Sequence, residues 1–236
     1  MKIPKIHGYI DRRILINFTA DPKIVEKIIP ASFRPKLFKD KAIVGICLIR
    51  LKNIKPKGFP DFFGIASENG AHRIAVEWDE DGQIKEGVYV PRRDTSLKLN
   101  ALVGGRIFPG KHHFAKFNVR EADGNYHIDF TSSDDTRISI DAKEVVIFDK
   151  NSIFETLENA SDFLAKGSVG YSPNGKKFDG LELKAYTWQV SPLEVSAVQS
   201  SFFENETLFP KGSVKFDNAL LMTQIEHEWQ SVADKF

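Results

Sequence analysis

The sequence predicts a mainly β protein of the α+β class, with a closed or nearly closed antiparallel sheet and a few short helices outside it. Apolar residues recur mostly with the two-residue period of strands. Pairs such as Asp-Gly and Asn-Gly, which favour tight hairpin turns, separate these stretches. Helix signals are confined to three segments, so many antiparallel strands fit better than alternating β-α-β units.

The first part of the chain predicts two strands with a short helix between them. Arg13–Phe18 is β-rich, and Ala42–Leu51 is a near-continuous apolar run suited to a strand buried on both faces. Between them, Asp21 is a preferred N-cap and Pro22 is a preferred first helical residue. Pro30 ends this helix.

A hairpin and a series of strands occupy the middle of the chain. His72–Trp78 and Ile84–Val90 alternate around the turn Asp79–Gly82, as the two arms of a hairpin do. Further strands are expected at His113–Val119, Tyr126–Thr131, Arg137–Asp141 and Val145–Phe148.

Two more helices are expected. One covers Ser96–Val103, with Asp94 or Thr95 as its N-cap and a Gly-Gly pair as its stop. The other follows the capping box Ser152–Glu155 and ends at Gly167.

The last part of the chain predicts strands again. Val169–Ser172 and Leu181–Val190 form a hairpin around the turn Pro173–Gly175. Glu194–Phe203 and Gln224–Trp229 are the remaining expected strands.

No repeat, low-complexity segment or linker divides the 236 residues, so one domain over residues 1–236 is expected. The only cysteine, Cys47, lies in an apolar run, which favours a buried structural thiol. A nucleophilic thiol would need an electropositive, partly exposed setting. The chain has no second cysteine for a disulfide, no signal peptide and no apolar stretch long enough to span a bilayer, so a cytoplasmic location is expected.

Charge is distributed unevenly along the chain. Residues 1–60 contain fourteen Lys and Arg and four acids, a balance of +10, and the remainder carries −9. The basic residues are scattered, which favours a solvated sheet face, and no nucleic-acid or membrane partner is expected. Phosphate loops, dinucleotide fingerprints, nucleophile elbows and zinc spacings are missing from the sequence, so no cofactor or metal is expected. The expected partner is a small molecule, and a homo-oligomer is left open.

The stretch Val90–Lys116 is the predicted ligand site. Arg92 and Arg93 lie at a strand-to-helix junction, where guanidinium donors and helix N–H groups can bind a carboxylate or phosphate. Adjacent strand residues point to opposite faces, so only one of these arginines can face a cavity; alternatively, both pair with surface acids. By the same rule His112 and His113 cannot share a metal ion. One of them is expected as an acid–base group or as a pocket wall.

Two other pairs share a strand face. If the face that carries Arg73 and Glu77 points inward, these residues form a buried charge pair, which would be costly outside a functional cavity. The alternative is that this face points outward. His227 and Trp229 either close one end of a pocket or pack against each other.

Motifs spread along nearly the whole chain resemble one known family. They are Ala31-Ser32-Phe33-Arg34-Pro35 before the strand Ala42–Leu51, Gly87-Val88-Tyr89 before Arg92-Arg93-Asp94-Thr95-Ser96, Arg106-x-Phe108 with His112-His113-x-Ala115, and Phe163-Leu164 before Tyr171 and Leu181. This pattern resembles the domain of unknown function 2071 family, which belongs to the acetoacetate-decarboxylase-like superfamily. The resemblance implies an antiparallel β-barrel flanked by short helices.

In that superfamily, acetoacetate decarboxylases carry a helix ending in Gly-Arg-Glu and a Gly-Phe-Pro-Lys-Lys loop with the Schiff-base lysine. The matching segment here reads Gly104-Gly105-Arg106, then Phe108-Pro109-Gly110-Lys111-His112-His113. Lys111 is the only lysine that matches, the match needs a gap, and histidine replaces the second lysine. A lysine nucleophile must be partly deprotonated although its unperturbed pKa is ~10.4. A mostly neutral histidine supplies less of the neighbouring positive charge that lowers this pKa.

Three classes of function therefore stay open. The barrel interior could bind a small organic carboxylate or carbonyl compound as a lyase or decarboxylase-like enzyme. The same cavity could serve a non-catalytic carrier or sensor, and a protein-interaction module is the third class. The candidate catalytic residues are Lys111, His112 and His113, and the candidate ligand-binding residues are Arg92, Arg93, Arg106, Arg73, Glu77 and His227.

Overall fold

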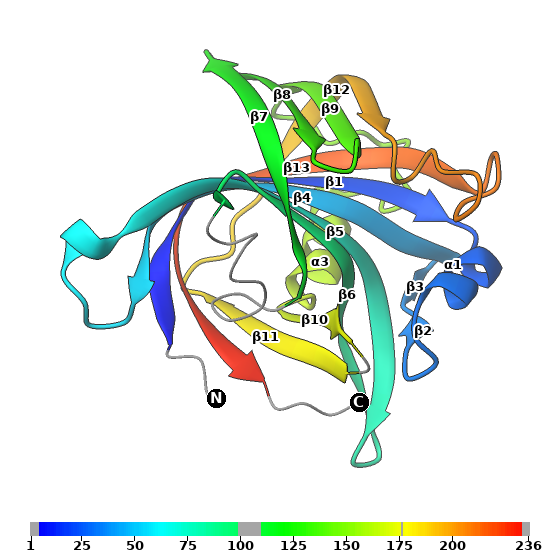
Figure 1. Ribbon diagram of the computed structural model, residues 1–236. Helices are drawn as coiled ribbons and strands as arrows, with labels where there is room; N and C mark the ends of the chain where they lie inside the picture. The colour runs from blue at the N-terminus through cyan, green and yellow to red at the C-terminus, as the bar shows by residue number, and fades with distance from the viewer. Residues whose placement is uncertain (1–4, 99–109, 176, 233–236) are drawn as a thin grey trace.

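The computed structural model describes residues 5–98, 110–175 and 177–232. Long antiparallel strands form its middle (Figure 1). In spatial order they are β13 (Val214–Val232), β1 (Ile6–Ala20), β4 (Lys41–Pro56), β5 (Ile65–Glu80) and β6 (Gln83–Thr95). The prediction of a mainly β protein is confirmed.

Two routes of paired strands connect β6 back to β13. The first runs through β7 (His112–Ala122), β8 (Asn125–Ser132), β9 (Arg137–Glu144) and β12 (Ser191–Ser200). The second runs through β10 (Val169–Asn174) and β11 (Lys177–Ala185). The two routes lie on opposite sides of the middle strands, and α3 lies on the side of β10 and β11 (Figure 1). The smaller elements are α1 (Pro22–Ile28), β2 (Arg34–Pro35), β3 (Leu37–Phe38), η1 (Asp61–Phe63) and α3 (Leu157–Ala165).

The middle strands bury side chains on both faces. Neighbouring residues of a strand point to opposite sides. Ile46 therefore belongs to one apolar cluster with Phe130 of β8, whereas its neighbour Cys47 belongs to a second cluster with Phe163 of α3. Residues 42–48 are all buried, which confirms the prediction of a strand covered on both faces.

Most predicted elements are present. The hairpin of β5 and β6 and the helix that begins at Pro22 are confirmed, and Asp21 Oδ1 caps that helix by accepting from Lys23 N (2.9 Å). The helix expected over Ser96–Val103 lies mostly outside the described residues. At its expected start Thr95 Oγ1 accepts from Leu97 N (3.3 Å). In the described part of the chain, no helix is long and apolar enough to cross a membrane.

Three details of the strand prediction are wrong. The sheet is not wholly antiparallel, because β6 pairs with both β7 and β10 in parallel. Val145–Phe148 is not a strand, and Val146 is 95% exposed. The ladder stops there because the next residue of the neighbouring strand is Pro192, which has no N–H to donate. The strand expected over Leu181–Val190 ends at Ala185.

The helix expected after Ser152 begins later, at Leu157. Glu155 has a φ of 64°, a left-handed conformation that interrupts a helix. The Ser152 hydroxyl donates to Asp217 (2.6 Å), which holds this segment as a turn. Thr156 caps α3 by accepting from Asn159 N (3.2 Å).

Candidate functional site

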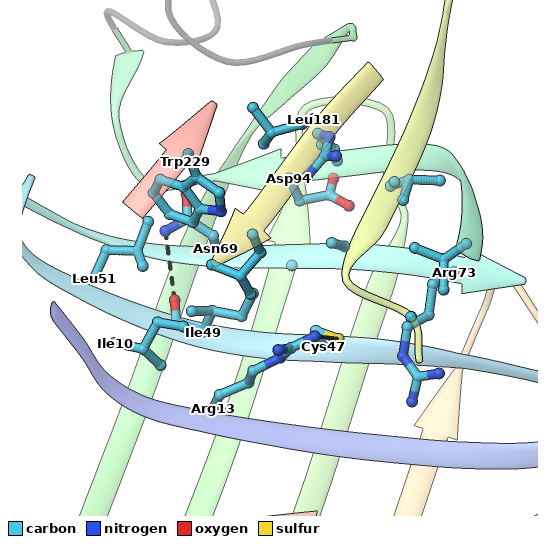
Figure 2. A pocket seen from close by; sticks show the side chains of 18 of the residues that line it. Ile10, Arg13, Cys47, Ile49, Leu51, Asn69, Arg73, Asp94, Leu181 and Trp229 are labelled. Atoms are coloured by element: carbon cyan, nitrogen blue, oxygen red, sulfur yellow. Dashed lines mark hydrogen bonds between the residues drawn. The ribbon is translucent and has the colours of Figure 1, made fainter. Parts of the chain in front are cut away.

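A cavity of about 110 Å³ lies between the middle strands and the layer formed by β10, β11 and the residues after α3 (Figure 2). This volume is several times the roughly 10–15 Å³ that one water molecule requires. Most of the wall is apolar, as in typical small-molecule sites. The apolar lining residues are Ile10, Ile49, Leu51, Ala71, Val88, Val90, Leu181, Leu183 and Trp229.

Three arginines from three strands line the same cavity: Arg13 of β1, Arg73 of β5 and Arg93 of β6. Within the described residues, none of them forms an ion pair with a carboxylate. Their contacts are neutral groups. Arg93 Nε donates to Ser172 Oγ (3.2 Å), and Arg73 donates to the Asn17 side-chain oxygen. Three positively charged side chains therefore line one cavity, and none of them is paired with a carboxylate among the described residues.

Two β-bulges turn Arg13 and Arg93 toward the cavity. Asp11 is an extra residue of β1 opposite β4, and Val90 and Pro91 of β6 together face one residue of β5. A bulge shifts the in–out alternation by one residue. Arg13 consequently shares a face with Ile10, and Arg93 shares a face with Val90, although each pair is three residues apart. Pro91 suits the bulge because it cannot donate to a regular ladder.

Two of the cavity arginines, Arg13 and Arg93, follow an arginine with the opposite environment. Arg12 is 2% exposed and pairs with Glu68 (2.5 Å) and Glu121. Arg92 donates to Asp94 through Nε (3.0 Å) and Nη2 (2.7 Å), and it also pairs with Asp134 (2.6 Å). The side-chain hydrogen bond from Arg92 holds the pKa of Asp134 below its usual range. Asp94 is the one acid among the described residues of the cavity wall, and it is paired with Arg92.

Cys47 lies beside these cations. Figure 2 shows Arg13 reaching from β1 to the sulfur of Cys47 on β4, where Arg13 Nη2 is 3.5 Å from Sγ. Cys47 is 3% exposed, as predicted, and its side chain forms part of the cavity wall. Burial raises the pKa of the Cys47 thiol, but the positive charges of Arg13 and Arg73 outweigh burial, so the pKa lies below its ordinary value. Burial also lowers the pKa of Arg93, to about 10.

Cys47, Ala71, Arg93 and His112 form one row of directly opposed residues across β4, β5, β6 and β7. Directly opposed residues project from the same face of a sheet at about 4.5–5.5 Å spacing. The small side chain of Ala71 therefore leaves an open space between the thiol and the arginine. His112 borders the same cavity next to Arg93.

A polar network fixes Arg73. Asn17 accepts from Arg73 and donates to Asn218 Oδ1 (2.8 Å), and Asn218 donates to Asp217 Oδ2 (2.6 Å). Gly45 is the residue directly opposite Arg73, and a Cβ there would lie 3.3 Å from Arg73 Nη2. The missing side chain leaves room for the guanidinium to cross β4 toward Asn17.

Only some of the site residues predicted from the sequence line the cavity. Arg73, Arg93 and His112 line the cavity. Lys111 is exposed, and Arg106 lies outside the described residues. The remaining residues have other contacts: Arg92 binds Asp94 and Asp134, His113 lies 3.4 Å from Asp134, and the ring of the buried His227 packs 4.2 Å from that of Trp229.

Arg73 and Glu77 do not form the buried charge pair that an inward orientation of their strand face would give. Arg73 faces inward, but Glu77 pairs with Arg34 (3.2 Å), its partner residue on β2. Residues four apart in a strand are too far apart for a direct contact, since each residue advances the chain by about 3.3 Å.

No lysine is among the described residues that line this cavity. The segment 99–109, which lies outside the described residues, contains no lysine in its sequence. Lys36 lines an adjoining cavity of about 30 Å³ that also touches Arg13 and Arg73. Its ammonium group pairs with Glu86 (2.6 Å) and donates to the carbonyl of Phe163 (3.3 Å). Both contacts turn the amine of Lys36 toward protein partners. Among the described side chains, no group of three His, Cys, Asp or Glu could hold a metal ion.

Sequence reasoning missed Arg13 and Cys47. The rule that only one of two adjacent strand arginines faces inward holds for Arg92 and Arg93, and it holds equally for Arg12 and Arg13. Cys47 could be recognised as part of a site only once the pairing of β1 with β4 was known, because its contact with Arg13 spans 34 residues of sequence.

Solved structures with similar folds are acetoacetate decarboxylase-like proteins. Acetoacetate decarboxylase from Legionella pneumophila subsp. pneumophila str. Philadelphia 1 has a TM-score of 0.59 at 13% identity, over 98% of this chain and 88% of that one. An acetoacetate decarboxylase-like enzyme from Sphingomonas wittichii RW1 has a TM-score of 0.61 at 7% identity, over 98% and 94%. The enduracididine biosynthesis enzyme MppR, complexed with pyruvate, has a TM-score of 0.60 at 8% identity, over 100% and 91%. At these identities the likeness establishes the fold.

No curated protein matches the sequence. A family model does match it, over residues 10–223, and that family is described as an uncharacterized conserved protein. The match covers β4, β5 and β6 completely, most of β1, the first half of β13 and the cavity residues from Ile10 to Leu183. The chain therefore belongs to the domain of unknown function 2071 family and has the acetoacetate-decarboxylase-like fold.

Proposed function

We propose that the protein is one domain that binds a small organic carboxylate inside a barrel-like ring of strands. Arg13, Arg73 and Arg93 supply the positive charge that attracts the carboxylate, and the apolar wall around Leu181 and Trp229 receives the rest of the ligand. The observation that carries this proposal is that three arginines line one cavity and that none of them has a carboxylate partner in the described residues. Burying positive charge without a counter-ion is costly, and a bound anion removes that cost.

The size and chemistry of the cavity support a compact ligand. A guanidinium group binds a carboxylate through paired N–H donors. The space beyond the arginines is small and apolar, so a short carbon chain suits it better than a sugar or a nucleotide. A structural neighbour complexed with pyruvate offers a compound of this class as a probe.

Schiff-base decarboxylation at Lys111 is disfavoured. Lys111 is exposed, and Lys36, which borders the adjoining cavity, is paired with Glu86. The fold is shared with decarboxylases, so a lyase or decarboxylase-like reaction that does not use a lysine stays within the proposal. A non-catalytic carrier or sensor is the second candidate, and the lack of a lysine in the described cavity wall favours it.

Thermal unfolding with matched ligands tests the binding proposal. Pyruvate should raise the unfolding midpoint in a concentration-dependent manner, because a ligand that binds only the folded state stabilises it. Acetone has the same methyl ketone without the carboxylate and should have no effect. Equal effects of both compounds, or no effect of pyruvate, would refute carboxylate binding by the arginines.

Borohydride reduction in the presence of acetoacetate tests the chemistry. We expect no reduced adduct on Lys36 or Lys111 in the intact mass spectrum or the peptide map. An adduct that disappears in Lys111→Ala or Lys36→Ala would restore the Schiff-base mechanism and show that the assignment of the lysines is wrong.

A further inference from the structure

Cys47 has the surroundings of a reactive thiol. Its Sγ lies 3.5 Å from Arg13 Nη2 and forms part of the cavity wall. Arg73, which is 4% exposed, also acts on the sulfur, and its Nε has no hydrogen-bond partner among the described residues. Two cations and an enclosed space therefore meet at one sulfur atom. Neighbouring cations stabilise the thiolate, which is the nucleophilic form of cysteine.

The row of opposed residues places this thiol at a defined position relative to Arg93. β5 separates the two residues, so their backbones are about 9–10 Å apart, two strand spacings of 4.7–4.9 Å. Ala71 stands between them and contributes only a methyl group. A carboxylate held by Arg93 thus brings the carbon next to the carboxyl group toward Sγ. Arg13 is close enough to Sγ to donate a hydrogen bond to an oxygen on that carbon.

The geometry points to Cys47 as the nucleophile of the cavity, adding reversibly to the carbonyl carbon of a 2-oxo acid whose carboxylate is bound by the arginines. This inference rests on the proposed carboxylate site. In the reaction the bond between Sγ and the carbonyl carbon forms and the carbon–oxygen π bond breaks. The proton that leaves the thiol ends on the carbonyl oxygen, so the product is a thiohemiketal and no further reactant is needed. The Arg13 guanidinium can stabilise the oxygen while it carries negative charge.

The first test uses iodoacetate, which is itself a small carboxylate with an electrophilic carbon. Sγ displaces iodide, the new bond joins sulfur to the methylene carbon, and the thiol proton goes to the buffer. Iodoacetamide is the neutral control, and the urea-unfolded chain gives the reference rate for each reagent. Cys47 is the only cysteine in the chain, so intact mass reports one site.

We expect the ratio of the iodoacetate rate to the iodoacetamide rate to be about tenfold higher in the folded protein than in the unfolded chain. In the wild-type protein, pyruvate should slow the alkylation of Cys47 by iodoacetate, because both compounds would bind the same arginines. Arg93→Gln should remove the preference, whereas Arg137→Gln, which deletes an exposed arginine, should keep it. An equal ratio in folded and unfolded protein, or no alkylation of the folded protein, would overturn the proposal.

The second test detects the adduct directly. Pyruvate labelled with ¹³C at its carbonyl carbon should give a new tetrahedral-carbon resonance with the wild-type protein and none with Cys47→Ser. A resonance that persists in Cys47→Ser, or none in the wild type, would overturn the role of Cys47. If pyruvate still raises the unfolding midpoint of Cys47→Ser while the wild type forms no adduct, the carboxylate site stands and the thiol proposal alone fails. If pyruvate binds neither protein, the proposed function itself fails.

Discussion

Arg92 and Arg93 are adjacent in sequence but serve opposite faces of β6. Arg92 is held between Asp94 and Asp134, whereas Arg93 enters the cavity and meets only the Ser172 hydroxyl among its described polar contacts. The bulge at Val90 and Pro91 decides which of the two faces inward. The same division separates Arg12 from Arg13 on β1. One arginine of each pair contributes to stability, and the other is available to a ligand.

This division predicts opposite effects of two adjacent substitutions. Arg92→Gln leaves the buried Asp94 without its cation and should lower the free energy of unfolding by about 3 kcal/mol. Arg93→Gln removes an unbalanced cation and should leave that free energy unchanged within about 1 kcal/mol, or raise it. Urea unfolding measures both values. A larger loss of stability in Arg93→Gln than in Arg92→Gln would contradict the assignment.

An internal counter-ion should compete with the ligand. Asn17→Asp keeps an oxygen acceptor beside Arg73 and adds a negative charge to it. The pyruvate affinity should then fall by about tenfold, because the loss of one charged hydrogen-bond partner is worth roughly 1.5–3 kcal/mol. Isothermal titration calorimetry measures the affinity. An affinity equal to that of the wild type would mean that the charge of Arg73 does not contribute to binding.

Gly45 should not tolerate a side chain. A Cβ at this position would lie 2.2 Å from the Ile16 carbonyl oxygen and 3.3 Å from Arg73 Nη2. Gly45→Ala should therefore destabilise the fold by about 1–3 kcal/mol, the usual cost of overpacking, and should displace Arg73. Gly170→Ala is the matched control, because its nearest contact would be an ordinary 3.4 Å. Similar unfolding free energies for the two variants would refute this role of Gly45.

Two buried histidines predict an acid-sensitive fold. Burial lowers the pKa of His72 to about 3 and that of His227 to about 4, whereas an unfolded histidine titrates near 6.5. Below about pH 6.5 the unfolded chain binds protons that the folded chain does not bind. The free energy of unfolding should therefore be independent of these histidines above about pH 6.5. Between about pH 6.5 and pH 4 it should fall by up to about 1.4 kcal/mol per pH unit for each histidine.

His72→Phe provides the check on this pH dependence. It preserves the ring contact with Phe202 and removes one of the two titrating groups. Urea unfolding at a series of pH values should show a shallower acid slope for the variant. The same slope as in the wild type would exclude His72 as a source of the acid sensitivity.

The sequence predicted the strands better than the site. Alternation and turn residues locate a strand such as Ala42–Leu51 because they act over a few residues. The site depends on pairing between distant strands, which alternation does not encode: Arg13 meets Cys47 only because β1 pairs with β4. Pro91 signals a bulge, but which arginine the bulge turns inward depends on its register with β5. A loop motif predicts Lys111 as a site residue, but a motif does not specify which way a side chain points.

A calorimetric titration of pyruvate into three proteins tests the central claim most directly. The wild type should bind pyruvate, Arg93→Gln should bind it about tenfold more weakly or not at all, and Arg137→Gln should match the wild type. This pattern would show that a cavity arginine, and not the overall charge of the chain, recognises the carboxylate. Equal affinities in all three proteins, or no binding by the wild type, would contradict the account.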